Sequence, residues 1–133
     1  MARVPQKFHS GLGGYRADLG CYFRSQLEAN YARYLDWLLA NGKIYNWVYE
    51  PRTFEFPERH GPKYYVPDFK IIYADGTHEW IETKGFMDSA SKLKLKRFRK
   101  HFPAEVLTVV GYDQYNKIKD RLGRTIPGWE GLE

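Results

Sequence analysis

Three charged residues are spaced so that a β-hairpin would bring them together. Asp68 opens one strand-like run, and the next run ends with Glu82 and Lys84, with the turn signal Asp75-Gly76 between the two runs. A hairpin in that register would bring Asp68 close to Glu82. Because strand side chains alternate between two faces, Lys84 would share the face of Glu82.

Two carboxylates beside an ammonium group suit the hydrolysis of a phosphodiester. Mg²⁺ takes oxygen ligands from one or two carboxylates, which Asp68 and Glu82 could supply, and the backbone carbonyl of Thr83 could complete the protein's share. Such a metal lowers the pKa of a bound water and neutralises charge on the scissile phosphate. Lys84 could orient or help to activate that water, or it could hold the phosphate.

The same residues have a simpler interpretation. Glu82 and Lys84 could form a surface ion pair, and Pro67-Asp68 could be an ordinary turn. Three details favour a site instead. Trp80-Ile81 puts the charged pair where a strand leaves the core, Gly85 allows close approach by a ligand, and the proline fixes the entry to the first strand.

A helix predicted at residues 24–40 could deliver a third carboxylate, Glu28. The apolar residues of this segment recur at helical spacing, and Asn41-Gly42 supplies the stop. Glu28 falls at the edge of the apolar stripe, so it either joins the acidic cluster or remains a solvated helical residue. Arg24, one turn earlier, could pair with Glu28 or bind phosphate.

A second predicted helix, residues 89–102, is strongly basic. Leu95, Phe98 and Phe102 form a narrow apolar seam, and cations cover most of the remaining surface. Crowded positive charges repel each other unless an anion meets them, so we expect either contacts with DNA phosphates, with a salt-dependent affinity, or a solvated basic face. The candidate DNA-binding residues are Arg24, Lys92, Lys94, Lys96, Arg97, Arg99 and Lys100.

The composition is that of one packed domain with a moderate preference for polyanionic partners. The 133 residues are 43% hydrophobic and 17% aromatic, with a net charge of +5 and a pI of about 9.3. Cys21 is the only cysteine, which excludes an internal disulfide. The four histidines lack metal-ligand spacing, and no P-loop or dinucleotide fingerprint occurs. No apolar run suits a membrane span or a signal peptide, so we expect a soluble protein of the cytoplasm.

The remaining elements follow from apolar patterning and turn residues. Residues 1–20 are interpreted as an N-terminal arm, either with Arg3, Lys7 and Arg16 on phosphates or as a flexible terminus. Residues 21–133 are expected to form the domain, with the element order α-β-β-β-α-β-α. Its strands are predicted at 44–56, 64–73, 78–84 and 106–110, and its third helix at 112–122.

Three motifs together resemble those of the PD-(D/E)xK nuclease superfamily, and within it the phage endonuclease I type of Holliday-junction resolvase. They are an Arg-Ser-x-Leu-Glu helix start at 24–28, a Val-Pro-Asp-Phe strand at 66–69 and Glu-Thr-Lys-Gly at 82–85. The resemblance spans about residues 24–100. The spacing between the motifs differs somewhat from the family's, and the final third of the chain is not specifically matched.

The resemblance implies an α/β fold of the restriction-endonuclease type, in which a central mixed β-sheet is flanked by helices. It also implies a Mg²⁺-dependent DNA endonuclease, with Mn²⁺ as a substitute. By this analogy Asp68 and Glu82 bind the metal, together with the Thr83 carbonyl. Glu28 completes the metal site, and Lys84 is the catalytic lysine. Such a resolvase acts as a homodimer, because a junction needs two symmetric cuts, and a phage origin would place it in the host cell.

Three kinds of function remain open on the sequence alone. The first is an endonuclease selective for branched DNA. The second is a sequence-specific nicking or homing endonuclease, or a transposase-type cleavage subunit, which would prefer a defined duplex site. The third is a DNA-binding module without chemistry, against which the complete set of acids and lysine argues.

Overall fold

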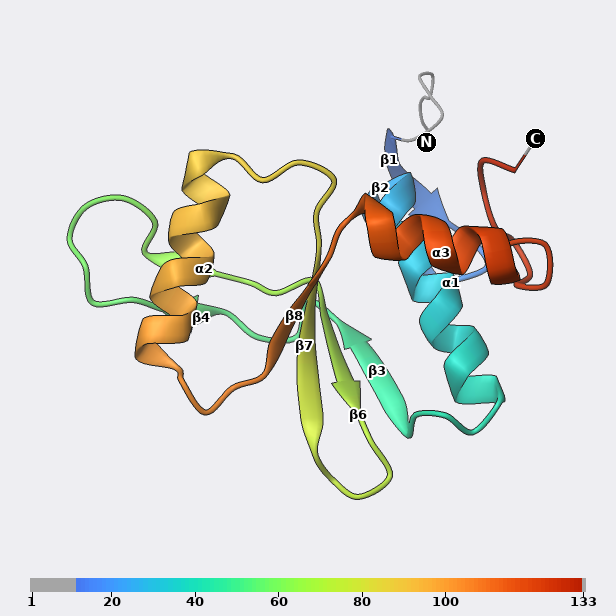
Figure 1. Cartoon of the computed structure of the whole chain (residues 1–133), viewed down its shortest axis with the longest axis horizontal. Coiled ribbons are helices and arrows are strands. Elements are labelled where there is room, and N and C mark those ends of the chain that lie inside the picture. The colour runs from blue at the N-terminus through green and yellow to red at the C-terminus, as the bar shows by residue number, and fades with distance from the viewer. Residues whose placement is uncertain (1–11, 133) are drawn as a thin grey trace. The chain divides into compact units, whose positions relative to one another are not determined.

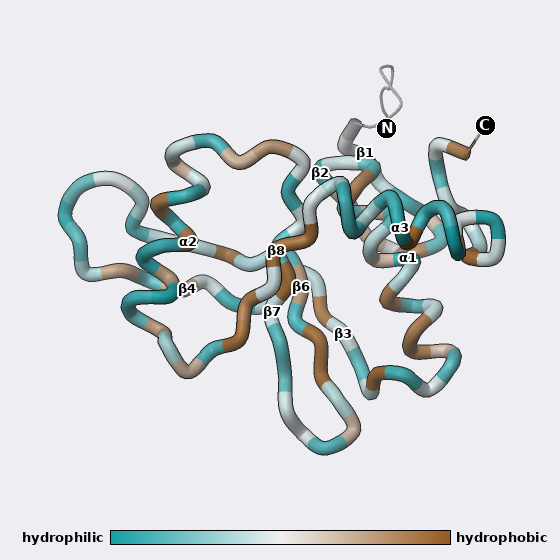
Figure 2. Tube along the Cα trace, viewed as in Figure 1, coloured by the Kyte–Doolittle hydropathy of each residue, from teal (hydrophilic) through white to brown (hydrophobic). Residues whose placement is uncertain are grey.

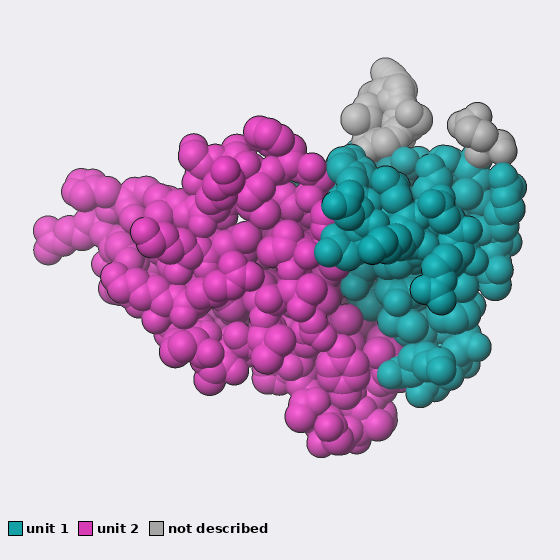
Figure 3. All heavy atoms as spheres, viewed as in Figure 1, with its two compact units in different colours: residues 1–43, 112–133 teal, residues 44–111 magenta. Residues whose placement is uncertain are grey.

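The computed structural model describes residues 12–132. The chain divides into two compact units (Figure 3). Unit 1 consists of residues 1–43 and 112–133, and unit 2 consists of residues 44–111. The domain predicted for residues 21–133 therefore spans both units, and each unit is described by itself.

Unit 1 begins with a β-hairpin that the sequence does not predict. Strand β1 (Leu12–Arg16) pairs antiparallel with β2 (Cys21–Ser25). The connecting turn closes where the backbone N–H groups of Leu19 and Gly20 donate to the carbonyl of Arg16, and Gly20 adopts a φ of 64°. Residues 12–16 thus belong to a strand rather than to the predicted arm, and residues 1–11, with Arg3 and Lys7, lie outside the described residues.

Helix α1 (Gln26–Ala40) confirms the helix predicted at residues 24–40. Ser25 is its N-cap, with the side-chain oxygen accepting from the backbone N–H of Glu28 at 3.0 Å. The helix ends at Asn41, and Gly42 takes a left-handed φ of 69°. Helix α3 (Tyr112–Leu122), predicted at 112–122, completes the helices of this unit.

Unit 2 is built on a mixed four-stranded sheet in the order β3-β6-β7-β8 (Figure 1). The first three strands pair antiparallel, and β7 and β8 pair parallel. The strands are β3 (Asn46–Tyr49), β6 (Phe69–Ile72), β7 (His78–Thr83) and β8 (Leu107–Val110). The turn predicted at Asp75-Gly76 is confirmed: Gly76 has a φ of 87° and donates its N–H to Tyr73.

A small second sheet interrupts the predicted strand at 64–73. Residues 64–65 form β5 (Tyr64–Tyr65), which pairs with β4 (Phe54–Glu55), whereas residues 69–72 form β6. Pro67 lies in the gap between them. Since proline cannot donate to a strand ladder, it favours such a break.

Helix α2 (Ser89–His101) provides the apolar side chains that fill the core of unit 2 with the two sheets. The helix is largely hydrophilic along its length (Figure 2), but Leu95 and Phe98 of the predicted seam are buried. Phe54 packs edge-on against Trp80 and Phe98, with ring centroids 5.2 and 4.8 Å away. The complete buried cluster is Phe54, Phe56, Tyr65, Trp80, Leu95 and Phe98.

The fold is therefore mixed α/β, with a mixed sheet and three helices in the described residues. The predicted order α-β-β-β-α-β-α appears as α1, β3, β6, β7, α2, β8 and α3, with β1–β2 and β4–β5 added. Within residues 12–132, no helix has the length and apolar character needed to cross a bilayer.

Candidate functional site

The antiparallel register of β6 and β7 puts the backbone of Asp68 across from that of Glu82. Phe69 pairs with Ile81 in the antiparallel ladder, so one further step along both strands puts Asp68 opposite Glu82. Opposite side chains of neighbouring strands lie about 5 Å apart at their Cβ atoms. Asp68, directly before β6, and Glu82, near the end of β7, therefore lie at the same end of the two central strands of the sheet.

Asp68 is held by Thr83. Asp68 is only 3% exposed. A carboxylate buried to this extent needs hydrogen-bond donors if it is to stay ionised. The backbone N–H and the side-chain hydroxyl of Thr83 both donate to Oδ2 of Asp68 at 2.8 Å. Thr83 was predicted to act through its carbonyl, and the structure adds this anchoring of Asp68.

Glu82 is held by a residue that the sequence analysis does not name. The phenol of Tyr65 donates to Oε1 of Glu82 at 2.7 Å. Burial raises the pKa of Tyr65 far above its ordinary value of 10.0, and the negative charges of Glu82 and Asp68 raise it further. Tyr65 therefore stays protonated and remains a donor at physiological pH.

Lys84 directly follows β7. Its backbone N–H donates to the carbonyl of Val110 at 3.0 Å, which fixes this point of the chain to β8. The pKa of Asp88 is lowered, first by the hydrogen bonds from Ser91 and to a lesser extent by the positive charge of Lys84. The ammonium group therefore acts electrostatically at the start of α2, where Asp88 is the N-cap.

Glu28 belongs to unit 1, whereas the other three site residues belong to unit 2. It is 7% exposed, and its Oε1 accepts the backbone N–H of Arg24 at 2.9 Å. The guanidinium of Arg24 lies 3.6 Å from Oε2, so Arg24 is the ion-pair partner that the sequence analysis offered as one alternative. The joining of Glu28 to the acids of unit 2 stays a prediction.

The basic residues of α2 differ in what they contact. Arg97 donates to the backbone carbonyls of His60 and Pro62 at 2.7 Å, so its guanidinium holds the loop before β5. Lys100 lies 3.9 Å from Glu58. Lys94 is half-buried, and the predicted phosphate-binding residues that are exposed on α2 are Lys92, Lys96, Arg99 and Lys100.

Arg99 is a cation of α2 whose charge acts on Tyr65, the residue that donates to Glu82. Its positive charge opposes the rise in the pKa of Tyr65, whose hydroxyl contacts Glu82. Arg99 also follows Phe98, whose ring packs edge-on against Tyr65 at 5.5 Å.

The carboxylate oxygens of Asp68 and Glu82 are the type of ligand that Mg²⁺ prefers. No three His, Cys, Asp or Glu side chains are grouped as a metal cage among residues 12–132. Unit 2 instead offers the two carboxylates of Asp68 and Glu82, and Mg²⁺ is usually bound by one or two carboxylates with waters and substrate phosphate as its other ligands. The residues present fit that mode of binding.

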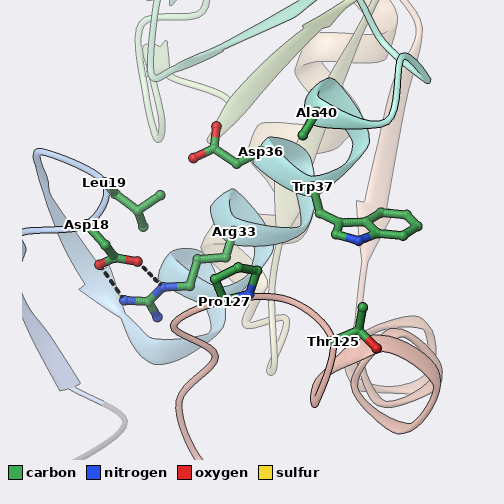
Figure 4. Close-up of a pocket in the computed structure, with 8 residues that line it drawn as sticks. All are labelled: Asp18, Leu19, Arg33, Asp36, Trp37, Ala40, Thr125 and Pro127. Carbon is green, nitrogen blue, oxygen red and sulfur yellow. Dashed lines mark hydrogen bonds and ion pairs between the residues drawn. The ribbon is translucent and has the colours of Figure 1, made fainter.

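Unit 1 contains a separate cavity of about 460 Å³ (Figure 4). Trp37 and Pro127 contribute apolar surface, and Arg33 lies beside them. The guanidinium donates to both oxygens of Asp18, and also to Asn30 and Glu130. These hydrogen bonds hold the Arg33 side chain within the fold, so we interpret Arg33 as a structural residue in the wall of the cavity.

Comparison with known proteins identifies a family without an assigned activity. The family described as "Protein of unknown function (DUF1064)" matches residues 16–117, and the chain belongs to this family. The match includes all three motifs of the sequence analysis. No curated protein and no solved structure matches the chain.

Proposed function

We propose that this member of the DUF1064 family is a Mg²⁺-dependent DNA endonuclease that hydrolyses phosphodiester bonds and prefers branched DNA. One observation carries the proposal: the register of β6 and β7 puts Asp68, directly before β6, across from Glu82 on β7, and Lys84 directly follows β7. Each carboxylate is fixed by a hydrogen bond from a buried residue. Two fixed acids, with a lysine two residues after the second, are the kinds of group that a site for a metal and a phosphate needs.

The arrangement of unit 2 supports a restriction-endonuclease-like fold. Asp68 directly precedes β6 and Glu82 lies on β7. These are the two central strands of a mixed sheet, and a parallel strand, β8, follows after α2. The lysine precedes a basic helix that packs its apolar seam into the core. This order of acid-bearing hairpin, lysine and helix is what the resemblance to the PD-(D/E)xK nucleases implies.

Each residue has a distinct part in the proposed reaction. Asp68, Glu82 and the Thr83 carbonyl would hold Mg²⁺, which when bound supplies Lewis-acid charge at the phosphate and an activated water. Thr83 keeps the Asp68 carboxylate oriented through two donors. Lys84 binds a phosphate oxygen or orients the attacking water, and its positive charge stabilises the developing negative charge.

The proposal also includes Glu28, the cations of α2 and the oligomeric state. The resemblance to the PD-(D/E)xK nucleases assigns Glu28 as a further acidic residue of the reaction, and the proposal keeps this role. The exposed cations of α2 bind the phosphate backbone, and the net charge of +5 supports this role. The enzyme works as a homodimer, since two symmetric cuts are needed to resolve a four-way junction.

The experiment compares cleavage of a four-way junction, a flap and the linear duplexes that form their arms, with and without Mg²⁺. We expect Mg²⁺-dependent cuts in the branched substrates and slow or absent cutting of the arms. A preference for one defined linear site would indicate a sequence-specific nuclease instead. Binding without cleavage of any substrate would contradict the proposed activity and indicate a DNA-binding module.

Active-site variants connect the cleavage to the acids. Asp68→Ala and Glu82→Ala should each lower the cleavage rate by at least about 10³-fold, because several kcal/mol of charge stabilisation is lost. Junction affinity, measured by fluorescence anisotropy without divalent metal, should persist. The control is Glu79→Ala, which removes a carboxylate from the other face of the same strand. An Asp68→Ala protein that cuts as fast as the parent would refute the site.

A further inference from the structure

The hydrogen bond between Tyr65 and Glu82 is built into the core of unit 2. Tyr65 is only 4% exposed, and its ring packs edge-on against Phe98 with centroids 5.5 Å apart. Its backbone pairs with Phe54 in the small β4–β5 sheet. Packing therefore fixes the ring on one side and strand pairing fixes its backbone, so the phenol oxygen has a defined position beside Glu82.

The fixed position of the phenol restricts the orientation of the Glu82 carboxylate. A glutamate side chain has three rotatable bonds, and it loses this freedom when it is held in one orientation. The 2.7 Å hydrogen bond from the phenol holds Oε1, and the rigid ring behind it keeps this donor in place. A carboxylate that is oriented in advance binds a cation more tightly, because the cation no longer has to order it.

We infer that Tyr65 is a positioning residue that orients Glu82 for the metal. This inference rests on the proposed function. It parallels the way in which Thr83 fixes Asp68, and groups that orient metal ligands typically change metal affinity by 10–100-fold when they are removed. It also extends the sequence motif from Pro-Asp to Tyr-x-Pro-Asp, since Tyr65 lies three residues before Asp68.

The sheet offers a matched control. The phenol of Tyr73 donates to Oε1 of Glu79 at 2.6 Å, so it makes the same kind of bond to another glutamate of β7. Glu79 is three residues before Glu82 and therefore lies on the opposite face of the strand. Tyr73→Phe thus removes an equivalent hydrogen bond that orients no proposed metal ligand.

The test measures binding of Mn²⁺ alone to the full chain, by calorimetry and by electron paramagnetic resonance. Tyr65→Phe keeps the ring and its packing and removes only the hydroxyl. We expect its Mn²⁺ dissociation constant to rise by about tenfold, with no change for Tyr73→Phe. In cleavage assays Tyr65→Phe should need more Mg²⁺ for half-maximal rate and should approach the parent rate at saturating Mg²⁺.

A second measurement uses the unaltered protein, so its result does not depend on whether the Tyr65→Phe variant folds. In protein with ¹³C-labelled tyrosine, a bound Mn²⁺ should broaden the ring signals of Tyr65 at lower metal concentration than those of Tyr73. If the two tyrosines broaden alike, or if Tyr65→Phe binds Mn²⁺ as tightly as the parent, the positioning role is refuted while the proposed function stands. If the parent protein binds no Mn²⁺ and cuts no DNA, both the role and the function are refuted.

Discussion

Glu28 has two explanations: a structural one at the start of α1, and the catalytic one of the proposed function. It lies in the first turn of α1, where its negative charge interacts favourably with the helix dipole. Its backbone N–H is capped by Ser25, and its carboxylate accepts the N–H of Arg24. The Arg-Ser-x-Leu-Glu motif is therefore fully used in building a helix start, whether or not Glu28 also meets the metal.

Two variants separate these explanations. Ser25→Ala should lower the free energy of unfolding by about 1 kcal/mol through loss of the cap, and cleavage should persist at temperatures well below the transition. Glu28→Gln should change stability by less than about 1 kcal/mol, because the amide oxygen can still accept the Arg24 N–H and the Arg24 side chain of the lost ion pair is 58% exposed.

The same Glu28→Gln protein should lose cleavage if the carboxylate belongs to the metal site. Denaturant unfolding and single-turnover cleavage of a junction measure the two effects independently. Cleavage at the parent rate would restrict Glu28 to the helix start and leave Asp68 and Glu82 as the protein's acids.

The residues of the site were predictable to different degrees. The register of Asp68 against Glu82 could be predicted because the turn residues fix the pairing of the two strands. The part of Lys84 stays a prediction. Tyr65 could not be predicted, since its role depends on the packing of β4–β5 against α2, which no local pattern reveals. Arg97 was counted with the phosphate-binding residues, but its donors hold the carbonyls of the loop before β5.

At the scale of elements, we propose α2 as the helix that binds DNA phosphates without reading the base sequence. One narrow seam of the helix is buried, and the exposed cations surround it. Exposed lysine and arginine residues bind phosphates by releasing condensed counterions, so their contribution appears in the salt dependence of affinity. A helix of this kind should contribute affinity rather than catalysis.

Replacing Lys92, Lys96 and Arg99 together by alanine should weaken junction binding and flatten its salt dependence. Each lost phosphate contact reduces the slope of log K against log salt by about 1, so the slope should fall by up to about 3. Anisotropy titrations at several salt concentrations measure it.

The control removes an equal charge from another helix. The triple variant of α3 carries alanine at Lys117, Lys119 and Arg121. It lowers the net charge by the same amount, so a specific role of α2 predicts a smaller change in slope. Equal slopes for the two variants would mean that net charge alone, rather than α2, governs binding.

The elements themselves divide into those with local signals and those without. The three helices have end signals or apolar periodicity, and each begins and ends within two residues of its prediction. The β1–β2 hairpin was missed because Gly13, Gly14 and Gly20 give the segment the composition of a loop. Its strand identity depends on long-range burial, with Phe23 fully buried in unit 1.

At the scale of the whole chain, unit 1 is held together by residues far apart in sequence. Glu130 accepts from Arg16 and Arg33, and its backbone exchanges hydrogen bonds with Asn30. These partners are 97 to 114 residues away, so no sequence pattern could reveal them. The C-terminal segment thereby joins the β1–β2 hairpin and α1 in one folded unit.

Protonation of this network should destabilise unit 1 in acid. Burial opposes the ionisation of Glu130, but the hydrogen bonds and charges of Arg16 and Arg33 outweigh it and lower its pKa below the ordinary 4.5. The hydrogen bond from Arg33 likewise lowers the pKa of Asp18 below 3.8. Groups whose pKa is lower in the folded state contribute stability above their unfolded pKa, and this stability is lost as the pH falls through the folded value.

Glu130→Gln should therefore cost about 2 kcal/mol of unfolding free energy near pH 7, the typical value of charge-assisted hydrogen bonds. The difference from the parent should begin to shrink below about pH 4.5, where Glu130 of the unfolded parent takes up a proton, and it should be lost as the pH falls through the lower pKa of the folded state. Hydrogen exchange followed by mass spectrometry reports the loss in peptides of unit 1. The control is Glu55→Gln, whose carboxylate is exposed and pairs with Lys63 at 3.5 Å, and which should change stability by less than about 0.5 kcal/mol. A cost for Glu130→Gln that stays constant from pH 7 to pH 3 would show that shape, rather than charge, is what the network requires at this position.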